Sequence, residues 1–170
     1  ERVLARSEDR YVHFFREHEE FFVQLVSRWH PIGPELLEQY ADRWNWRRGL
    51  SKNDNLLWSE DLIKRYSHRW SWRELSRNEG IPWSGELIGR CSDLGSLNWP
   101  HWNWKNLSMN ESIPWTMELL KNYADQWEWG GRGLSGNEAL PWTENLINRF
   151  AERWSWGALS ANKGLPWTQD

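Results

Sequence analysis

Residues 102–116 read WNWKNLSMNESIPWT, and most of this phrase recurs along the chain. A Leu-Ser pair occurs five times, an Asn follows two residues after each Ser, and a Trp follows five residues after each Asn. The leucines of these pairs are Leu50, Leu75, Leu107, Leu134 and Leu159, spaced 25, 32, 27 and 25 residues apart. A W-x-W pair accompanies each copy. Agreement of this kind across five copies predicts a tandem array of structural repeats.

The Leu-Ser-x-Asn part of each copy predicts a short helical turn. Ser108 and Glu111 have the spacing of a capping box, in which the serine side chain caps the turn that follows it. The same residue types recur at Ser76/Glu79 and Ser135/Glu138. The repeated Asn side chains have two interpretations: each helps to cap its own turn, or together they form a ladder that binds a ligand.

A longer helix is predicted after the Pro-Trp bend of each copy. Thr116 suits an N-cap, because a threonine hydroxyl accepts hydrogen bonds from the first N–H groups of a helix. Leu119, Tyr123 and Trp127 then recur at the spacing of one helix face. We expect the tryptophans at the bends to be buried between adjacent copies, namely Trp58, Trp83, Trp115 and Trp142.

These patterns predict an all-α solenoid of about five two-helix repeats, each about 25 residues long, over residues 31–170. Such units must stack, because one copy alone cannot bury its apolar face. Residues 1–30 predict an amphipathic helix that caps the first repeat, with Phe22, Leu25 and Trp29 on its apolar side. The sequence stops within a repeated phrase, so we expect it to be part of a larger protein or assembly.

The phrase W-x-W-x-x-L-S-x-N-x-x-[IL]-P-W-[ST] resembles the Trp-rich tandem repeats of large uncharacterised bacterial proteins. The resemblance covers about residues 34–170 and implies no activity. Residues 107–114 also resemble part of a plant-type leucine-rich repeat. A leucine-rich-repeat-like solenoid is therefore the alternative fold, although Arg73 and Lys105 stand where that family has a leucine.

Composition argues against several classes of function. The 21 Lys and Arg residues are outnumbered by 24 Asp and Glu residues, whereas nucleic-acid binders usually show a basic excess. No apolar run approaches the length of a membrane span. Cys91 is the only cysteine, which fits a reducing compartment, and we expect a cytoplasmic protein. Cys91 takes the place of Tyr66, Tyr123 and Phe150 in other copies, and it is expected to be a buried, inert thiol.

Patterns for catalysis and metal binding are incomplete. The five histidines do not pair at the helical spacing of metal ligands, so we expect no metal or cofactor. No serine lies in a G-x-S-x-G context, and we expect no enzymatic activity. Residues 130–133 read GGRG, which is interpreted as an expanded turn, with an anion cradle as the alternative. The leading hypothesis is a scaffold that binds a protein partner.

Basic residues at one position of the repeat are the first candidates for partner binding. Arg47, Arg73 and Lys105 follow the W-x-W pairs of three copies, and Arg132 lies in the expanded turn of the next. In stacked copies they would form a basic line that attracts an acidic segment of a partner. Alternatively, each cation lies over a neighbouring indole and stabilises the fold.

An irregular insertion near residues 95–101 gives two further candidates, Trp99 and His101. Insertions in repeat proteins often carry function. The alternative is a loop whose Trp99 fills the gap left by a missing repeat tryptophan. A second function also remains open: exposed tryptophans can form platforms that bind carbohydrate. The 17 tryptophans make this a small-ligand alternative to protein binding.

Overall fold

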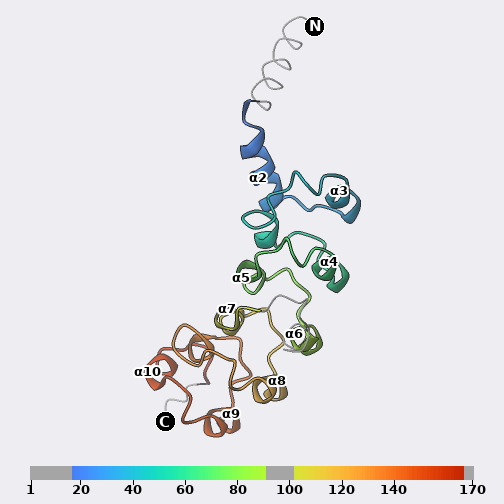
Figure 1. Ribbon diagram of the computed structural model, residues 1–170. Helices are drawn as coiled ribbons and strands as arrows, with labels where there is room; N and C mark the ends of the chain where they lie inside the picture. Colours follow the sequence, from blue (N-terminus) through green and yellow to red (C-terminus); the bar gives the residue numbers. More distant parts are fainter. Residues whose placement is uncertain (1–16, 91–101, 167–170) are drawn as a thin grey trace, which may run out of the picture.

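The computed structural model describes residues 17–90 and 102–166 (Figure 1). All regular structure within these ranges is helical, and no β-strand occurs there, which confirms the all-α prediction for this part of the chain. A leucine-rich repeat needs a strand in every unit, so the alternative fold finds no support in these residues. None of the described helices is long and apolar enough to cross a membrane.

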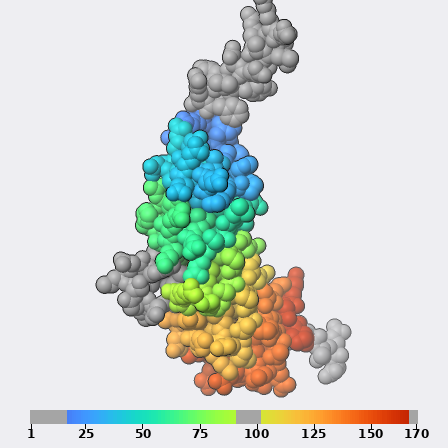
Figure 2. All heavy atoms as spheres, turned by 90° about the vertical axis from the view of Figure 1, so that its right-hand side faces the viewer, coloured from blue at the N-terminus to red at the C-terminus, as the bar shows by residue number. Residues whose placement is uncertain are grey.

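Two kinds of helix alternate along the chain. The helices after the bends are α3 (Pro34–Gln39), α4 (Glu60–Arg65), α6 (Gly85–Arg90), α8 (Met117–Asn122) and α9 (Glu144–Arg149). The shorter helices are η1 (Leu50–Lys52), α5 (Trp72–Leu75), α7 (Trp104–Ser108), η2 (Leu134–Gly136) and α10 (Trp156–Leu159). In Figure 1, α3, α4, α6 and α8 follow one another along one side, and α5 and α7 lie on the other. Figure 2 shows the successive segments as consecutive bands of colour.

Below, the copies are numbered 1 to 5 in the order of their Leu-Ser pairs, and each begins at the first Trp of its W-x-W pair. The five pairs are Trp44/Trp46, Trp70/Trp72, Trp102/Trp104, Trp127/Trp129 and Trp154/Trp156. The predicted caps of the helices after the bends are confirmed. Thr116 accepts a 3.1 Å hydrogen bond from the N–H of Leu119 at the start of α8. Ser59, Ser84 and Thr143 make the equivalent bond in α4, α6 and α9.

These helices are shorter than predicted. Helix α8 ends at Asn122, because Tyr123 adopts φ −123° and ψ 28°, outside the helical region. Trp127 therefore lies beyond the helix, although it is still buried in the core. The expected helix face through Trp127 is wrong, and a turn brings these apolar side chains together instead.

The predicted capping boxes are also wrong. In three copies the short helix begins at the second Trp of the W-x-W pair; α5 and α10 end directly before the repeated serine, and α7 ends at it. The Ser108 hydroxyl donates to the carbonyl oxygen of Trp104 at 2.7 Å and accepts from the N–H of Glu128, in the next copy, at 2.9 Å. The serine therefore ends its own short helix and contacts the next copy, and it does not cap a following turn.

The tryptophans at the bends are buried, as predicted. Trp58, Trp83, Trp115 and Trp142 are only 7–9% exposed. The Trp115 indole N–H donates to the carbonyl oxygen of Asn110 at 3.1 Å, and its ring packs edge-on against Trp127 of the next copy at 5.0 Å. Because Trp58, Trp83 and Trp142 make the same two contacts, the aromatic core is continuous from one copy to the next.

Helix α2 (Glu19–Trp29) joins the first copy through a serine that the sequence pattern missed. Ser27 is buried, and its Oγ accepts a 3.2 Å hydrogen bond from the N–H of Asn45, just as the Ser51 Oγ accepts from Ser71 at 2.9 Å. The end of α2 thus takes the place of a preceding Leu-Ser pair. Its predicted apolar side is partly wrong, because Leu25 and Trp29 are exposed.

Candidate protein-binding surface

The repeated asparagines bond each copy to the one before it. Asn110 Nδ2 donates to the carbonyl oxygens of Ser76 at 3.2 Å and Asn78 at 3.4 Å, both in the preceding copy. Its Oδ1 accepts from the N–H of Ser112 at 2.9 Å, within its own turn. The same arrangement is made by Asn53, Asn78, Asn137 and Asn162, with the end of α2 acting as the preceding copy for Asn53.

These bonds decide between the two interpretations of the asparagines. The role in the local turn is confirmed, and the bonds to the preceding copy are an addition that the sequence pattern did not reveal. All five side chains are buried. Since both amide hydrogens and the amide oxygen are engaged within the fold, the ladder does not present them to a ligand.

The four predicted basic residues are on the surface. Arg47, Arg73, Lys105 and Arg132 are all exposed. None of them forms an ion pair or a cation–π contact with another residue that the structure describes. The alternative interpretation, in which these cations cover neighbouring indoles, is therefore wrong within the described residues.

Other arginines cover the indoles. The Arg69 guanidinium lies 5.3 Å from the ring centre of Trp46, and its two terminal nitrogens bond to the Ala41 carbonyl oxygen and the Asp42 carboxylate, each at 2.7 Å. Arg153 repeats these contacts with Trp129, Ala124 and Asp125. Both arginines directly precede the first Trp of a W-x-W pair, a position that was not among the predicted basic residues.

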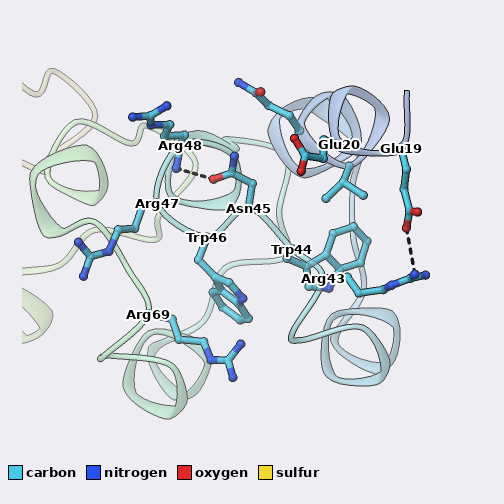
Figure 3. Close-up of a pocket in the computed structure, with 11 residues that line it drawn as sticks. Glu19, Glu20, Arg43, Trp44, Asn45, Trp46, Arg47, Arg48 and Arg69 are labelled. Carbon is cyan, nitrogen blue, oxygen red and sulfur yellow. Dashed lines mark hydrogen bonds and ion pairs between the residues drawn. The ribbon is translucent and has the colours of Figure 1, made fainter. Parts of the chain in front are cut away.

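An open groove of about 980 Å³ lies between α2 and the W-x-W segment of the first copy (Figure 3). Its charged lining residues are Glu19, Glu20, Arg43, Arg47, Arg48 and Arg69. Arg43 pairs with Glu19 at 2.9 Å and Arg69 pairs with Asp42. The guanidinium groups of Arg47 and Arg48 have no ion-pair partner among the described residues, and Figure 3 shows them across the groove from Glu19. This edge of the groove therefore carries uncompensated positive charge.

The expanded turn at Arg132 is poorly suited to an anion. Gly130 N–H donates to the Glu128 carboxylate at 3.2 Å, and Leu134 N–H donates to the Glu128 carbonyl oxygen at 2.8 Å. A carboxylate already occupies the mouth of the turn, so a second anion there would be repelled. Arg132 itself remains exposed and contributes only to the surface charge.

Three of the residues singled out in the sequence, namely Cys91, Trp99 and His101, lie outside the described residues.

Of the fifteen tryptophans that are described, only Trp29 and Trp156 are exposed, by 60% and 58%. Residues 17–90 and 102–166 hold no group of three or more His, Cys, Asp or Glu side chains that could bind a metal. No protein-family model, curated protein or solved structure matches the chain.

Proposed function

We propose that the copies form one solenoid, and that this solenoid is a non-enzymatic scaffold that binds an acidic segment of a protein partner. The binding surface is the basic line, defined as Arg47, Arg73, Lys105 and Arg132. The observation that carries the proposal is the exposure of all four side chains without an ion-pair partner among the described residues. Arg47, Arg73 and Lys105 directly follow a W-x-W pair, so uncompensated positive charge recurs at one repeat position of copies 1 to 3, in a chain whose net charge is −3.

The spacing of the line suits an extended peptide. Serine and asparagine bonds join equivalent positions of successive copies, which supports placing Arg47, Arg73 and Lys105 in line on copies 1 to 3. Arg132 extends the line in the expanded turn of copy 4, and Gly157 ends it in copy 5. Packed helices lie about 8–10 Å apart, and an extended chain advances about 3.3 Å per residue. An acidic residue at every third position of a partner segment therefore matches the line.

The test uses a fluorescent peptide with glutamate at every third position. Wild-type protein should bind it, and the affinity should fall as salt is raised, because exposed charges are screened over about 8–10 Å. The combined change Arg47→Glu, Arg73→Glu, Lys105→Glu should abolish binding and leave the melting temperature nearly unchanged. If this triple variant binds normally or melts early, the line is not the binding surface.

A charge-matched control separates a specific surface from general attraction. Arg65, Lys121 and Arg149 are exposed cations on α4, α8 and α9. Replacing all three with glutamate changes the net charge by the same amount as the test variant. Arg65 pairs with Glu38 at 3.6 Å, but both side chains are largely exposed, so the loss of this pair costs little. The control should still bind, and equal loss of binding would contradict the proposal.

A carbohydrate-binding module is the second candidate, because Trp29 and Trp156 are exposed. Retention on a glycan array that is lost in Trp29→Ala or Trp156→Ala would favour it over the acidic-peptide proposal. For either function we propose a reducing compartment, the cytoplasm, because Cys91 is the only cysteine in the sequence.

A further inference from the structure

One aromatic contact is repeated at the four junctions between copies. The second Trp of a W-x-W pair packs edge-on against the first Trp of the next pair, with ring centres 4.7–4.8 Å apart. The four contacts are Trp46–Trp70, Trp72–Trp102, Trp104–Trp127 and Trp129–Trp154. The first Trp of each of these later pairs is only 3–5% exposed. A regular junction therefore includes an indole of the preceding copy that helps to bury the first Trp of the next.

The junction between α2 and copy 1 has a valine in place of this indole. Ser27 takes the part that Ser76 plays at a later junction, and Trp72 lies four residues before Ser76. Residues four apart lie on the same face of a helix, so the equivalent position on α2 is Val23. A valine covers much less of an indole than a second indole does. In agreement, Trp44 is only half-buried, although it is the first Trp of its pair.

The open groove of about 980 Å³ lies at this junction, and Val23 and Trp44 both line it. Within the described residues, the only ring that contacts Trp44 is Tyr40 of its own turn, edge-on at 6.3 Å. The bend before α3 also lacks a Trp, but residues 31–34 of that bend do not line the groove. The groove is therefore found where the other junctions hold an indole, and it follows from a residue within the described chain.

The charges around the groove favour an acidic ligand. Besides the paired Arg43 and Arg69, the lining has two arginines, Arg47 and Arg48, and one carboxylate, Glu20, that form no ion pair with a described residue. In Figure 3, Glu20 lies on α2, and the two arginines lie at the opposite edge. A negatively charged segment is thus attracted to the Arg47–Arg48 edge, away from Glu20.

We propose that the groove binds an aromatic side chain of the partner's acidic segment; the acidic part of this inference rests on the function proposed for the basic line. The aromatic ring packs against Trp44 beside Val23, in the way that an indole does at the four later junctions. A neighbouring carboxylate of the segment pairs with Arg47 or Arg48. Aromatic side chains that fill a pocket often dominate the binding energy of an interface.

Arg47 belongs both to the groove and to the basic line, so the groove lies at one end of that line. An aromatic residue held there fixes where the acidic segment begins. Charge attraction alone leaves an acidic segment free to shift by one copy along the cations, whereas a ring in the groove fits at this junction only, because the later junctions already contain an indole. The groove thus sets the register of the partner.

The test compares three fluorescein-labelled peptides, each titrated with the whole chain. The parent peptide has glutamate at every third position, and the other two carry an added Trp at one end or at the other, so that both directions of the segment are covered. One Trp peptide should bind about tenfold more tightly than the parent, as expected for an aromatic pair together with its buried area. Equal Kd values for all three would overturn the groove proposal and leave the basic line intact. Failure of all three to bind would contradict both proposals.

Val23→Trp fills the groove with an indole of the chain itself. In this variant the Trp peptide should bind about tenfold more weakly than to wild type, the parent peptide should bind as before, and the melting temperature should not fall. Leu57→Trp is the matched control, because it adds an indole at a position that is 65% exposed and outside the groove. The control should keep the preference for the Trp peptide. The same preference in Val23→Trp would overturn the proposal.

A second variant tests the charged edge without changing the packing. Arg48 is exposed and is not part of the basic line, so Arg48→Glu should weaken binding of the Trp peptide by several-fold and keep the wild-type melting temperature. Arg65→Glu, on the surface of α4, is its charge-matched control and should bind normally. Equal effects of the two would count against the proposal. Sedimentation that shows self-association of the wild type, lost in Val23→Trp, would identify a second copy as the occupant and would contradict the stated partner.

Discussion

The Ser76 hydroxyl accepts a 2.9 Å hydrogen bond from the main-chain N–H of Asn103, which lies 27 residues further along the chain. At the other junctions the donor is the N–H of Ser71, Glu128 or Ser155. Because the donor is always a main-chain group, the middle residue of the W-x-W pair is free to vary. The acceptor is a side chain, and this accounts for the serine at the same position in copies 1 to 4.

Removing this acceptor should weaken one junction. Ser76→Ala leaves the Asn103 N–H without its partner, and an unpaired buried donor costs about 1–3 kcal/mol. We expect the free energy of unfolding, measured by urea titration, to fall by this amount. Ser160→Ala is the control: Ser160 is exposed, and its loss should cost about 0.5 kcal/mol or less. Equal effects of the two variants would show that the inter-copy bond adds nothing.

The asparagine ladder predicts a pH-dependent variant. Asn110→Asp keeps an acceptor for the Ser112 N–H, but it places a carboxylate oxygen against the carbonyl oxygens of Ser76 and Asn78. Burial and these oxygens raise the pKa of the introduced carboxyl above its unfolded value of about 3.9. A raised folded pKa means that stability is retained below about pH 3.9 and lost as the pH rises through the folded value.

Asn110→Asp should therefore lose about 3–5 kcal/mol at pH 7, as expected for an uncompensated buried charge. Relative to wild type it should lose clearly less at pH 4, where the protonated carboxyl can donate to one of the two carbonyls. The matched control is Asn145→Asp, on the surface of α9, which should cost less than about 0.5 kcal/mol at either pH. A loss for Asn110→Asp that does not change with pH would argue against the ladder geometry.

Tryptophans at the bends should contribute far more to stability than the exposed ones. Trp115→Ala removes a buried indole and its contact with Trp127, and should cost about 3–5 kcal/mol. Trp29→Ala removes an exposed indole that contacts Arg28 at 4.2 Å, and should cost about 1 kcal/mol or less. Thermal denaturation followed by near-UV circular dichroism compares the two. A similar change in melting temperature for both would contradict the packing described.

Substitution of two glycines by alanine should change the free energy of unfolding in opposite directions. A methyl group on Gly80 would overlap the carbonyl oxygen of Asp54 in the preceding copy, so Gly80→Ala should destabilise by about 1–3 kcal/mol. Nothing lies near Gly157 in α10, and Gly157→Ala should stabilise by about 0.5–1 kcal/mol through helix propensity. Urea titration measures both changes. Destabilisation by Gly157→Ala, or tolerance of Gly80→Ala, would be the contrary result.

Much of the local fold could be predicted from the sequence. The period, the caps at Thr116 and Thr143, and the burial of Trp115 follow from short-range patterns, because an N-cap and its helix lie within four residues of one another. The role of Ser108 could not be predicted in this way. Its acceptor role involves Glu128, 20 residues away, while the S-x-x-E spacing indicates only a local contact. A choice between the local cap and the contact with Glu128 requires knowing that the two segments are adjacent in space.

The candidate surface was predicted in part. The exposure of Arg47 and Arg73 agrees with their position after the W-x-W pair, but the cations that cover indoles are Arg69 and Arg153. The groove beside Arg48 was missed, because it forms only when α2 lies against the first copy. Recurrence of an arginine directly before the first Trp was the available signal for the indole contacts.

Amide hydrogen exchange measured by NMR tests most directly whether the copies form one hydrogen-bonded stack. The relevant amides are those of Ser71, Asn103, Glu128 and Ser155, the middle residues of their W-x-W pairs. All four residues lie outside the helices, so no hydrogen bond within a helix protects their amides. If the copies form one stack, all four amides should exchange slowly. In Ser76→Ala, the exchange rate of the Asn103 amide should rise before that of the other three. Exchange of these four amides at the rate of an unstructured peptide, while the amides of α8 remain protected, would contradict a single stack.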